Sequence, residues 1–294
     1  MKRTADIRSR DPFVLPVAAT NTYYLYAATD LNGRALGFDC FRSRDLEHWE
    51  GPIPVFRPTP DFWATMSYWA PEVHAYQGRY YLFASFKAPE HYRGTQILVA
   101  EAPEGPFTPL TDGPVTPPDW ECLDGTLFVD DGGTPWMVFC HEWVQVHNGG
   151  MWAMPLSADL RAAASRPVFL FSASEAPWKR LPSWPTANDP NRFPTYVTDG
   201  PFLYRTRDGV LLMLWSSFGI GGYTLGIARS ITGRIEGPWV QDPEPLYTQD
   251  GGHAMLFRTF DGRLMLALHS PNRRPDERAR LIQVVDCGQT LKII

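Results

Sequence analysis

The chain has 294 residues, which is enough for one large domain or two ordinary ones. It contains 28 prolines and 24 glycines but only 20% charged residues, a composition that favours many short strands joined by turns over long helices. The formal net charge of −5, without any lysine- or arginine-rich run, argues against nucleic acid as a partner. No stretch reaches the ~18 apolar residues of a membrane span, so we expect no membrane partner.

The N-terminus and the cysteines bear on the cellular compartment. Residues 1–8 are rich in charge and no apolar signal segment follows them, which predicts a cytoplasmic protein. The cysteines are widely spaced and form no C-x-x-C pair, so we expect buried free thiols at Cys40, Cys122, Cys140 and Cys287. The sequence carries no indication of the oligomeric state.

One short pattern recurs in five copies along the chain. In each copy an apolar strand runs to a tight turn and then into a second, aromatic- or aliphatic-rich strand. The copies begin at residues 10–14, 69–73, 123–128, 198–203 and 252–257. Turns at residues 77–78, 131–133, 208–209 and 261–262 have the Asx-Gly or glycine-rich sequences of β-hairpins.

The spacing of these copies predicts the fold. The turn glycines recur about every 53 to 54 residues, with one longer interval where residues 172–194 form a proline- and tryptophan-rich insertion. This period fits a four-stranded propeller blade and exceeds the lengths of helical repeats. We therefore expect an all-β, single-domain, five-bladed β-propeller over residues 1–294, rather than a solenoid. Such a fold places the starts of its innermost strands around one axial pocket.

Three aspartates occupy the second position of their copies, at Asp11, Asp124 and Asp199. Aspartate is seldom buried without a partner, so three in register are too many for packing alone. Two carboxyl groups across a sugar-sized pocket can hydrolyse a glycoside, one protonating the leaving oxygen and the other activating water or attacking the sugar. The alternative interpretation is that each aspartate only caps a turn before Pro or Gly.

At this point the residues match a known family. The opening Arg10-Asp11-Pro12, the segments 69–74 and 78–82, the segments 124–128 and 130–132, Thr198-Asp199-Gly200-Pro201 and the blade ending at 235–239 occur in one order. Together they resemble glycoside hydrolase family 43, the five-bladed propeller enzymes that include β-xylosidases, α-L-arabinofuranosidases and arabinanases. The resemblance covers almost the whole chain.

The resemblance implies a role for each aspartate. It makes Asp11 the general base, Asp124 the residue that tunes the acid, and Asp199 the general acid. The last assignment departs from the family pattern, which usually has Glu before Gly-Pro. Asp is one methylene shorter, so either the backbone brings it closer or another carboxylate, Glu142 or Glu72, supplies the proton.

Other residues are candidates for binding. The resemblance places the imidazole of His253 beside a calcium-centred water cluster on the axis, and thus implies a divalent metal cofactor, although calcium prefers oxygen ligands. A neutral structural histidine is the alternative. Trp69 is a candidate aromatic wall for a sugar face, Arg274 could reach sugar hydroxyls, and Glu72 and Glu142 could also contact substrate. Blade packing for Trp69 and a solvated loop for Arg274 are the alternatives.

The expected activity is inverting hydrolysis of terminal xylose, L-arabinofuranose or both from small plant-derived oligosaccharides. Two alternatives remain open. An endo-arabinanase needs an open groove, which the insertion at 172–194 could extend or wall off. A catalytically inactive sugar-binding propeller would explain the altered acid position.

Overall fold

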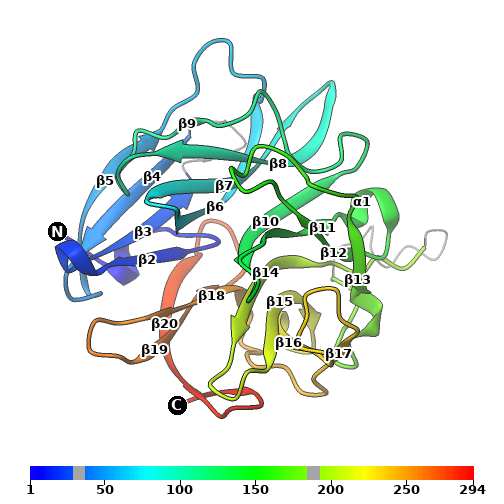
Figure 1. The fold of residues 1–294 in the computed structure, drawn as a ribbon. Coiled ribbons are helices and arrows are strands. Elements are labelled where there is room, and N and C mark those ends of the chain that lie inside the picture. Colours follow the sequence, from blue (N-terminus) through cyan, green and yellow to red (C-terminus); the bar gives the residue numbers. More distant parts are fainter. Residues whose placement is uncertain (29–36, 184–192) are drawn as a thin grey trace.

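Five antiparallel sheets are arranged around an axis in the computed structural model, which describes residues 1–28, 37–183 and 193–294 (Figure 1). The prediction of a five-bladed β-propeller is thus confirmed. Apart from β1 (Lys2–Arg3), which lies on the outer edge of the first blade, the strands of each blade follow one another in chain order from the innermost strand outward. Residues 184–192 of the predicted insertion lie outside the described residues.

The strands of the five blades have the following bounds. Blade 1 contains β2 (Phe13–Val17), β3 (Thr22–Ala28), β4 (Phe38–Ser43) and β5 (His48–Phe56), with β1 (Lys2–Arg3) on its outer edge. Blade 2 contains β6 (Met66–Tyr76), β7 (Arg79–Ala88), β8 (His91–Ala100) and β9 (Thr108–Pro109), and blade 3 contains β10 (Cys122–Val129), β11 (Pro135–His141), β12 (Gly150–Pro155) and β13 (Val168–Ser172). Blade 4 contains β14 (Asp199–Arg205), β15 (Leu211–Gly219), β16 (Gly222–Ser230) and β17 (Trp239–Gln241), and blade 5 contains β18 (Gly252–Arg258), β19 (Leu264–Ser270), β20 (Arg278–Asp286) and β21 (Leu291–Ile293).

Helical segments are short in the described part of the chain. They are α1 (Trp143–Val146) and the 3-10 turns Thr4–Asp6, Ala18–Thr20 and Ala173–Glu175. No helix among the described residues has the length and apolar character needed to cross a membrane.

The second strand of each blade carries most of the core. Every residue of β11 and β19 is buried, because these strands have neighbours on both edges and blades on both faces. Their continuous apolar runs are typical of strands covered on both faces. Three of the predicted buried cysteines, Cys40, Cys122 and Cys140, are indeed buried free thiols, whereas Cys287 is a free thiol on the surface.

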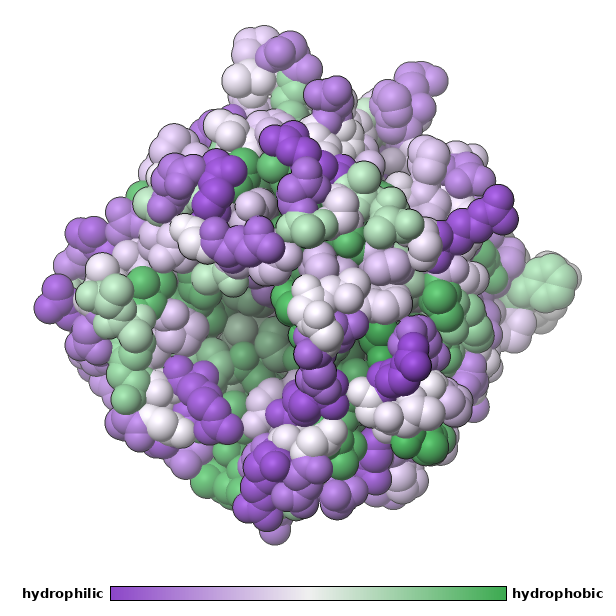
Figure 2. Space-filling view, viewed as in Figure 1, coloured by the Kyte–Doolittle hydropathy of each residue, from purple (hydrophilic) through white to green (hydrophobic). Residues whose placement is uncertain are grey.

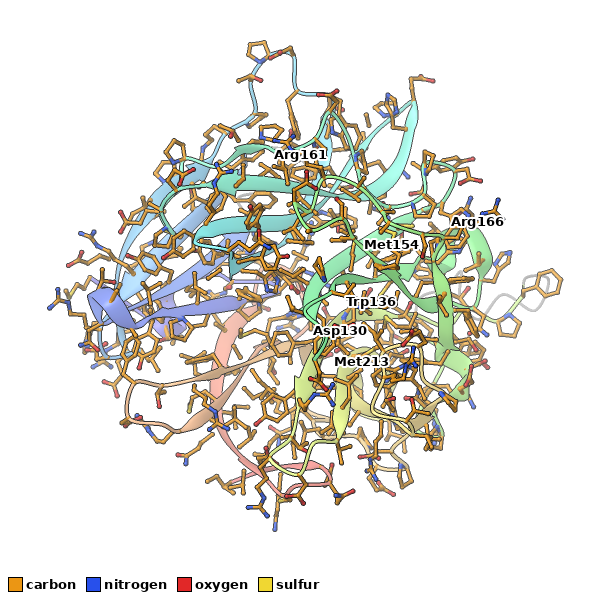
Figure 3. The ribbon with its side chains drawn as sticks, in the orientation of Figure 1. Asp130, Trp136, Met154, Arg161, Arg166 and Met213 are labelled. Carbon is orange, nitrogen blue, oxygen red and sulfur yellow. The ribbon has the colours of Figure 1, made fainter. Side chains whose placement is uncertain are left out.

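The predicted hairpin turns close the innermost strand pairs. In the β10–β11 turn, Asp130 Oδ1 accepts the backbone N–H groups of Gly132 and Thr134, and Oδ2 accepts the indole N–H of Trp136 (Figure 3). A side chain that accepts its own turn's amides stabilises a turn of this kind.

The N-terminal segment joins the first blade to the last. The backbone N–H of Ser9 donates to the carbonyl of Glu277, and Arg8 forms an isolated bridge with Arg278 of β20. This contact holds residues 8–11 against the loop between β19 and β20. The face of the molecule in Figure 2 is largely hydrophilic at its rim and hollowed near its middle, where hydrophobic side chains are exposed in the hollow.

Candidate active site

Each innermost strand begins with the same backbone irregularity. A bulge follows the first paired residue of β14 and β18 and the second paired residue of β6 and β10, and the residue after that pair has a positive φ. These positive-φ residues, with the equivalent residue before β2, are Asp11 (φ 50°), Ala70 (48°), Asp124 (57°), Gly200 (50°) and His253 (51°). A conformation that L-residues rarely adopt is therefore repeated at the same point of all five blades.

This register corrects the predicted alignment of Asp199. Asp199 lies one residue before the bulge position, which Gly200 occupies, and so corresponds to Trp69 in blade 2 rather than to Asp124. The Asp-Gly dipeptide of blade 3 suggested the other alignment, but the backbone superposes Gly200-Pro201 on Asp11-Pro12. Asp11, Asp124 and His253 share one position, and Asp199 projects from the neighbouring one.

Gly200 is required by the packing at this point. A Cβ atom on Gly200 would lie 2.6 Å from Cγ of His253, closer than real Cβ contacts. Its backbone N–H donates to Asp124 Oδ2 at 3.0 Å. The missing side chain thus lets blades 3, 4 and 5 approach one another.

Two imidazoles face the carboxylate of Asp11. His253 Nδ1 lies 3.1 Å from Asp11 Oδ1, and His269 Nδ1 lies 3.2 Å from the backbone nitrogen of Asp11. His269 Nε2 contacts Asn272 Oδ1 at 3.1 Å, and because that oxygen only accepts, Nε2 carries the proton and Nδ1 accepts the Asp11 N–H. Asp11 is therefore held through both its backbone and its side chain.

These neighbours keep Asp11 ionised. Burial by itself raises its pKa, but the charges of His253 and Arg10 outweigh burial and hold the pKa of Asp11 well below its usual range. In turn, burial lowers the pKa of His253 while Asp11, Asp124 and Asp199 raise it, and the net direction is upward.

Asp124 and Asp199 form a second, different environment. Burial raises the pKa of Asp124 to about 7, against the charge of His253 and with the added repulsion of Asp199 and Asp11. Burial likewise raises the pKa of Asp199, opposed by His253 and by the hydroxyl of Tyr223, which donates to Asp199 Oδ2 at 2.9 Å. The two carboxyl groups titrate as a coupled pair, and they share one proton as the pH approaches neutral.

These groups line one pocket of about 360 Å³. Of the predicted site residues, the pocket wall includes seven and leaves out one: Asp11, Asp124, Asp199, Trp69, Glu142, Arg274 and His253 line it, and Glu72 does not. A volume near the lower end of the ~300–1,000 Å³ typical of small-molecule sites suits a short saccharide.

Glu72 is displaced from the pocket by the same register. It is the first residue after the bulge, the position that holds Phe13, Phe202 and Met255 in other blades. That position packs into the core, where Glu72 is buried and contacts His74 Nε2 at 3.1 Å. Glu72 therefore does not line this pocket, and its predicted contact with substrate stays a prediction.

Trp69 and Glu142 form one wall together with Arg93. The guanidinium of Arg93 lies 4.3 Å from the centroid of the Trp69 ring and forms an ion pair with Glu142. This cation–π contact fixes the indole plane beside the pocket. Glu142 is thus buried and engaged in an ion pair with Arg93.

Several residues of the site have no signature in the sequence. The backbone N–H of Asp124 donates to Ser85 Oγ, and that of His253 donates to Ser216 Oγ, so the second strand of each preceding blade satisfies the strained position. Tyr223 and Arg93 come from outer strands. The only signal in the sequence for these residues is that Ser85 and Ser216 are small polar residues at the ends of the apolar runs of β7 and β15.

The donors around His253 allow a test of the expected metal. Its Nε2 is buried and has no hydrogen-bond partner, so this nitrogen has room for a proton-bearing or cationic neighbour. Among the described residues, however, no cluster of three or more His, Cys, Asp or Glu could hold a metal ion. In its neutral form, with the proton on Nδ1 towards Asp11, His253 fits the role of a single protein ligand to a hydrated cation through Nε2.

A five-bladed propeller that gathers three carboxyl groups with divided proton affinities in one sugar-sized pocket defines a class of protein, the glycoside hydrolases. The chain belongs to the glycosyl hydrolases family 43, whose family profile matches residues 5–287.

Proteins of known structure agree with this membership. The chain is 41% identical to an endo-arabinase from Bacteroides thetaiotaomicron VPI-5482, with 98% of each chain covered and a TM-score of 0.90. It is 25% identical to an endo-1,4-β-xylanase from the same organism, covering 100% of this chain and 96% of the other at a TM-score of 0.78. A segment of 90 residues is 32% identical to xylosidase/arabinosidase 43A of Humicola insolens and spans 24% of that protein.

Proposed function

We propose that this glycosidase cleaves pentosyl linkages with inversion, using Asp11 as general base and Asp199 as general acid. The observation that carries the proposal is the contrast between two carboxyl groups in one pocket: neighbouring positive charges hold the pKa of Asp11 below its usual range, whereas burial raises the pKa of Asp199. Enzymes that divide acid and base roles between carboxyls use such a contrast.

Asp11 suits the base because it is ionised and oriented before substrate arrives. His253 and His269 fix its carboxylate and its backbone. In the proposed reaction Asp11 takes a proton from a water molecule as that water attacks the anomeric carbon. Since Asp11 accepts a single proton, it is free for the next turnover once that proton passes to solvent.

Asp199 suits the acid better than its alternates do. It is partly accessible to the pocket, whereas Asp124 is buried and uses Oδ2 to accept the Gly200 N–H, a bond that favours ionised Asp124. Glu142 is paired with Arg93, and Glu72 lies outside the pocket. Asp199 therefore gives its proton to the leaving oxygen, while the charge on Asp124 raises the proton affinity of Asp199 beforehand.

The proposed substrate carries a terminal L-arabinofuranosyl or xylosyl unit. The pocket has the volume for a short saccharide, and Trp69 presents an aromatic face in its wall. Internal cleavage of arabinan is the second candidate, and the 41% identity to an endo-arabinase favours it.

Product analysis separates these candidates. The purified protein is incubated with linear arabinan, p-nitrophenyl α-L-arabinofuranoside and p-nitrophenyl β-xyloside, and early products are resolved by chromatography and proton NMR. Arabinose or xylose alone, released first as the inverted anomer, supports exo-acting hydrolysis. Arabino-oligosaccharides as first products identify the endo activity. A retained anomer contradicts the base role of Asp11, and binding without turnover identifies a sugar-binding protein.

We further propose that His253 is a protein ligand of a hydrated divalent ion, with calcium as the first candidate. Such an ion would supply positive charge next to Asp11 and so stabilise its ionised form. Metal content measured by elemental analysis before and after chelation tests this. The proposal predicts about one ion per chain in the wild type and none in His253→Ala; a metal-free preparation with full activity contradicts it.

A further inference from the structure

Three arginines converge on one buried carboxylate at the side of the pocket next to Asp11. Arg8 and Arg10 come from the segment before β2, and Arg274 comes from the loop between β19 and β20. All three line the pocket, and we call them the arginine wall. Glu277, which is fully buried, lies behind them.

Glu277 does not satisfy the three guanidinium groups. Its Oε2 accepts one hydrogen bond from Arg8 Nε at 3.4 Å. Its Oε1 lies 3.6 Å from Arg10 Nη1 and 3.9 Å from Arg274 Nε, and it accepts no hydrogen bond. Each guanidinium has five N–H donors, so most donors of Arg10 and Arg274 are left for a ligand.

The three cations of the wall face the carboxylates of Glu277 and, at 3.8 Å from Arg10, Asp11, whose charge is already shared with His253. Asp199 is a further negative charge that acts on Arg10. Among the described residues, Arg274 makes no ion pair except the long one to Glu277. This concentration of positive charge stands out in a chain whose formal net charge is −5.

The neighbouring residue Arg273 shows the contrast. It forms an ion pair with Asp276 at 2.6 Å, has a side chain that is 75% exposed, and does not line the pocket. Arg273 is a solvated surface residue, whereas Arg274 presents its guanidinium to the pocket.

A neutral sugar needs hydrogen bonds but gains little from excess positive charge, and gathering three cations costs repulsion that amide side chains would avoid. Guanidinium groups match carboxylates geometrically and by charge. We propose that the arginine wall binds the carboxylate of a uronic acid residue, so that the substrate class is an acidic, uronate-bearing oligosaccharide. This inference rests on the proposed function only in taking the pocket as a saccharide site.

Calorimetric titration tests the inference without requiring turnover. D-galacturonate and D-glucuronate are titrated into the wild type at low salt and compared with D-galactose and D-glucose. We expect at least tenfold tighter binding of a uronate than of its neutral counterpart, and a smaller preference at 0.5 M NaCl because the contact is ionic. Equal binding of charged and neutral sugars overturns the inference.

Two matched variants locate the effect. Arg274→Gln should lose at least fivefold of the preference for uronate, and Arg273→Gln should keep all of it, because only Arg274 faces the pocket. Thermal unfolding confirms that both variants are folded. The same loss in both variants, or no loss in Arg274→Gln, overturns the inference.

Simple anions separate a sugar site from a general anion site. Sodium acetate and inorganic phosphate are titrated at the same concentrations, and we expect both to bind more weakly than the uronates. Acetate or phosphate that binds as tightly as a uronate overturns the uronic acid assignment. A protein that prefers uronates but hydrolyses no pentoside fails the proposed function alone, and one that hydrolyses pentosides without this preference fails the inference alone.

Discussion

Asp11 and the Asp124–Asp199 pair are buried in the same pocket, yet their surroundings shift their pKa values in opposite directions. Asp11 lies between two imidazoles and beside Arg10, so its pKa is lowered. Asp124 and Asp199 lie beside each other, and burial together with like charge raises their pKa values. The comparison shows that the neighbouring blade, more than the aspartate itself, decides whether a carboxyl group stores a proton or accepts one.

Removal of the ionised carboxylate, that of Asp11, should have the largest effect on kcat. We expect Asp11→Asn to lower kcat by at least about 10³-fold, in the upper part of the range for loss of a general base. Asparagine retains the shape but neither accepts the proton nor attracts His253. Steady-state kinetics on an aryl arabinofuranoside or xyloside measure the loss, and Asp261→Asn in the exposed β18–β19 turn is the control. Turnover within tenfold of the wild type would remove the base role from Asp11.

The next largest effect on kcat should come from a variant that disturbs the contact of Gly200 with His253, which lies between Asp11 and the Asp124–Asp199 pair. In Gly200→Ala the new Cβ would clash with the His253 ring, so His253 must shift and its contacts with Asp11 and Asp124 must change. We expect a loss of about 10²-fold in kcat, because small displacements of catalytic groups cost that much.

Gly209→Ala is a matched control for this variant. Gly209 lies in the turn of the same blade with a positive φ of 84°, but its added Cβ would meet no atom within 4 Å. Both variants carry the backbone strain, which destabilises by ~1–2 kcal/mol, and only Gly200→Ala carries the clash. Similar kinetics in the two variants would show that the approach of Gly200 to His253 does not matter for catalysis.

The pH dependence of kcat/KM tests the same comparison, and its expected effect is smaller. The carboxyl pair must hold its proton, and the pKa of Asp124 is about 7, so kcat/KM should fall as the pH rises through about 7. Asp11 must be ionised, and its lowered pKa places the acidic limb below the usual range of aspartate.

In Asp124→Asn the repulsion within the pair is removed, so the pKa of Asp199 should decrease and the alkaline limb should move down by about half a unit or more. Rate profiles between pH 3 and 9 on one substrate measure both limbs. An alkaline limb that stays in place in this variant would show that Asp124 does not tune the acid.

The fold was predictable from the sequence because the repeat is long and its second strands are continuously apolar. Strands such as β19 are buried along their whole length, so few residue types other than apolar ones fit there. The hairpin turns fix the register of these strands. The membership of Asp11, Asp124 and His253 in one pocket followed from the same repeat.

Other parts of the site could not be predicted, for physical reasons. The position of Asp199 depends on a bulge, and Thr198-Asp199-Gly200-Pro201 can be aligned on either its Asp-Gly or its Gly-Pro dipeptide. The position of Glu72 outside the pocket depends on a bulge in the same way. The arginine wall joins segments from opposite ends of the chain, and Arg93 comes from β8, which carries no part of the recurring pattern.

The central claim, that Asp199 gives the proton and Asp11 receives one, is tested most directly by the leaving-group dependence of Asp199→Ala. A dinitrophenolate leaves without protonation, whereas a sugar alcohol needs it. We predict a loss of about 10²-fold or more on a natural disaccharide and of less than about tenfold on the dinitrophenyl glycoside, with no such selectivity in Glu142→Ala. Equal losses on both substrates in Asp199→Ala, or selectivity in Glu142→Ala instead, would contradict the account.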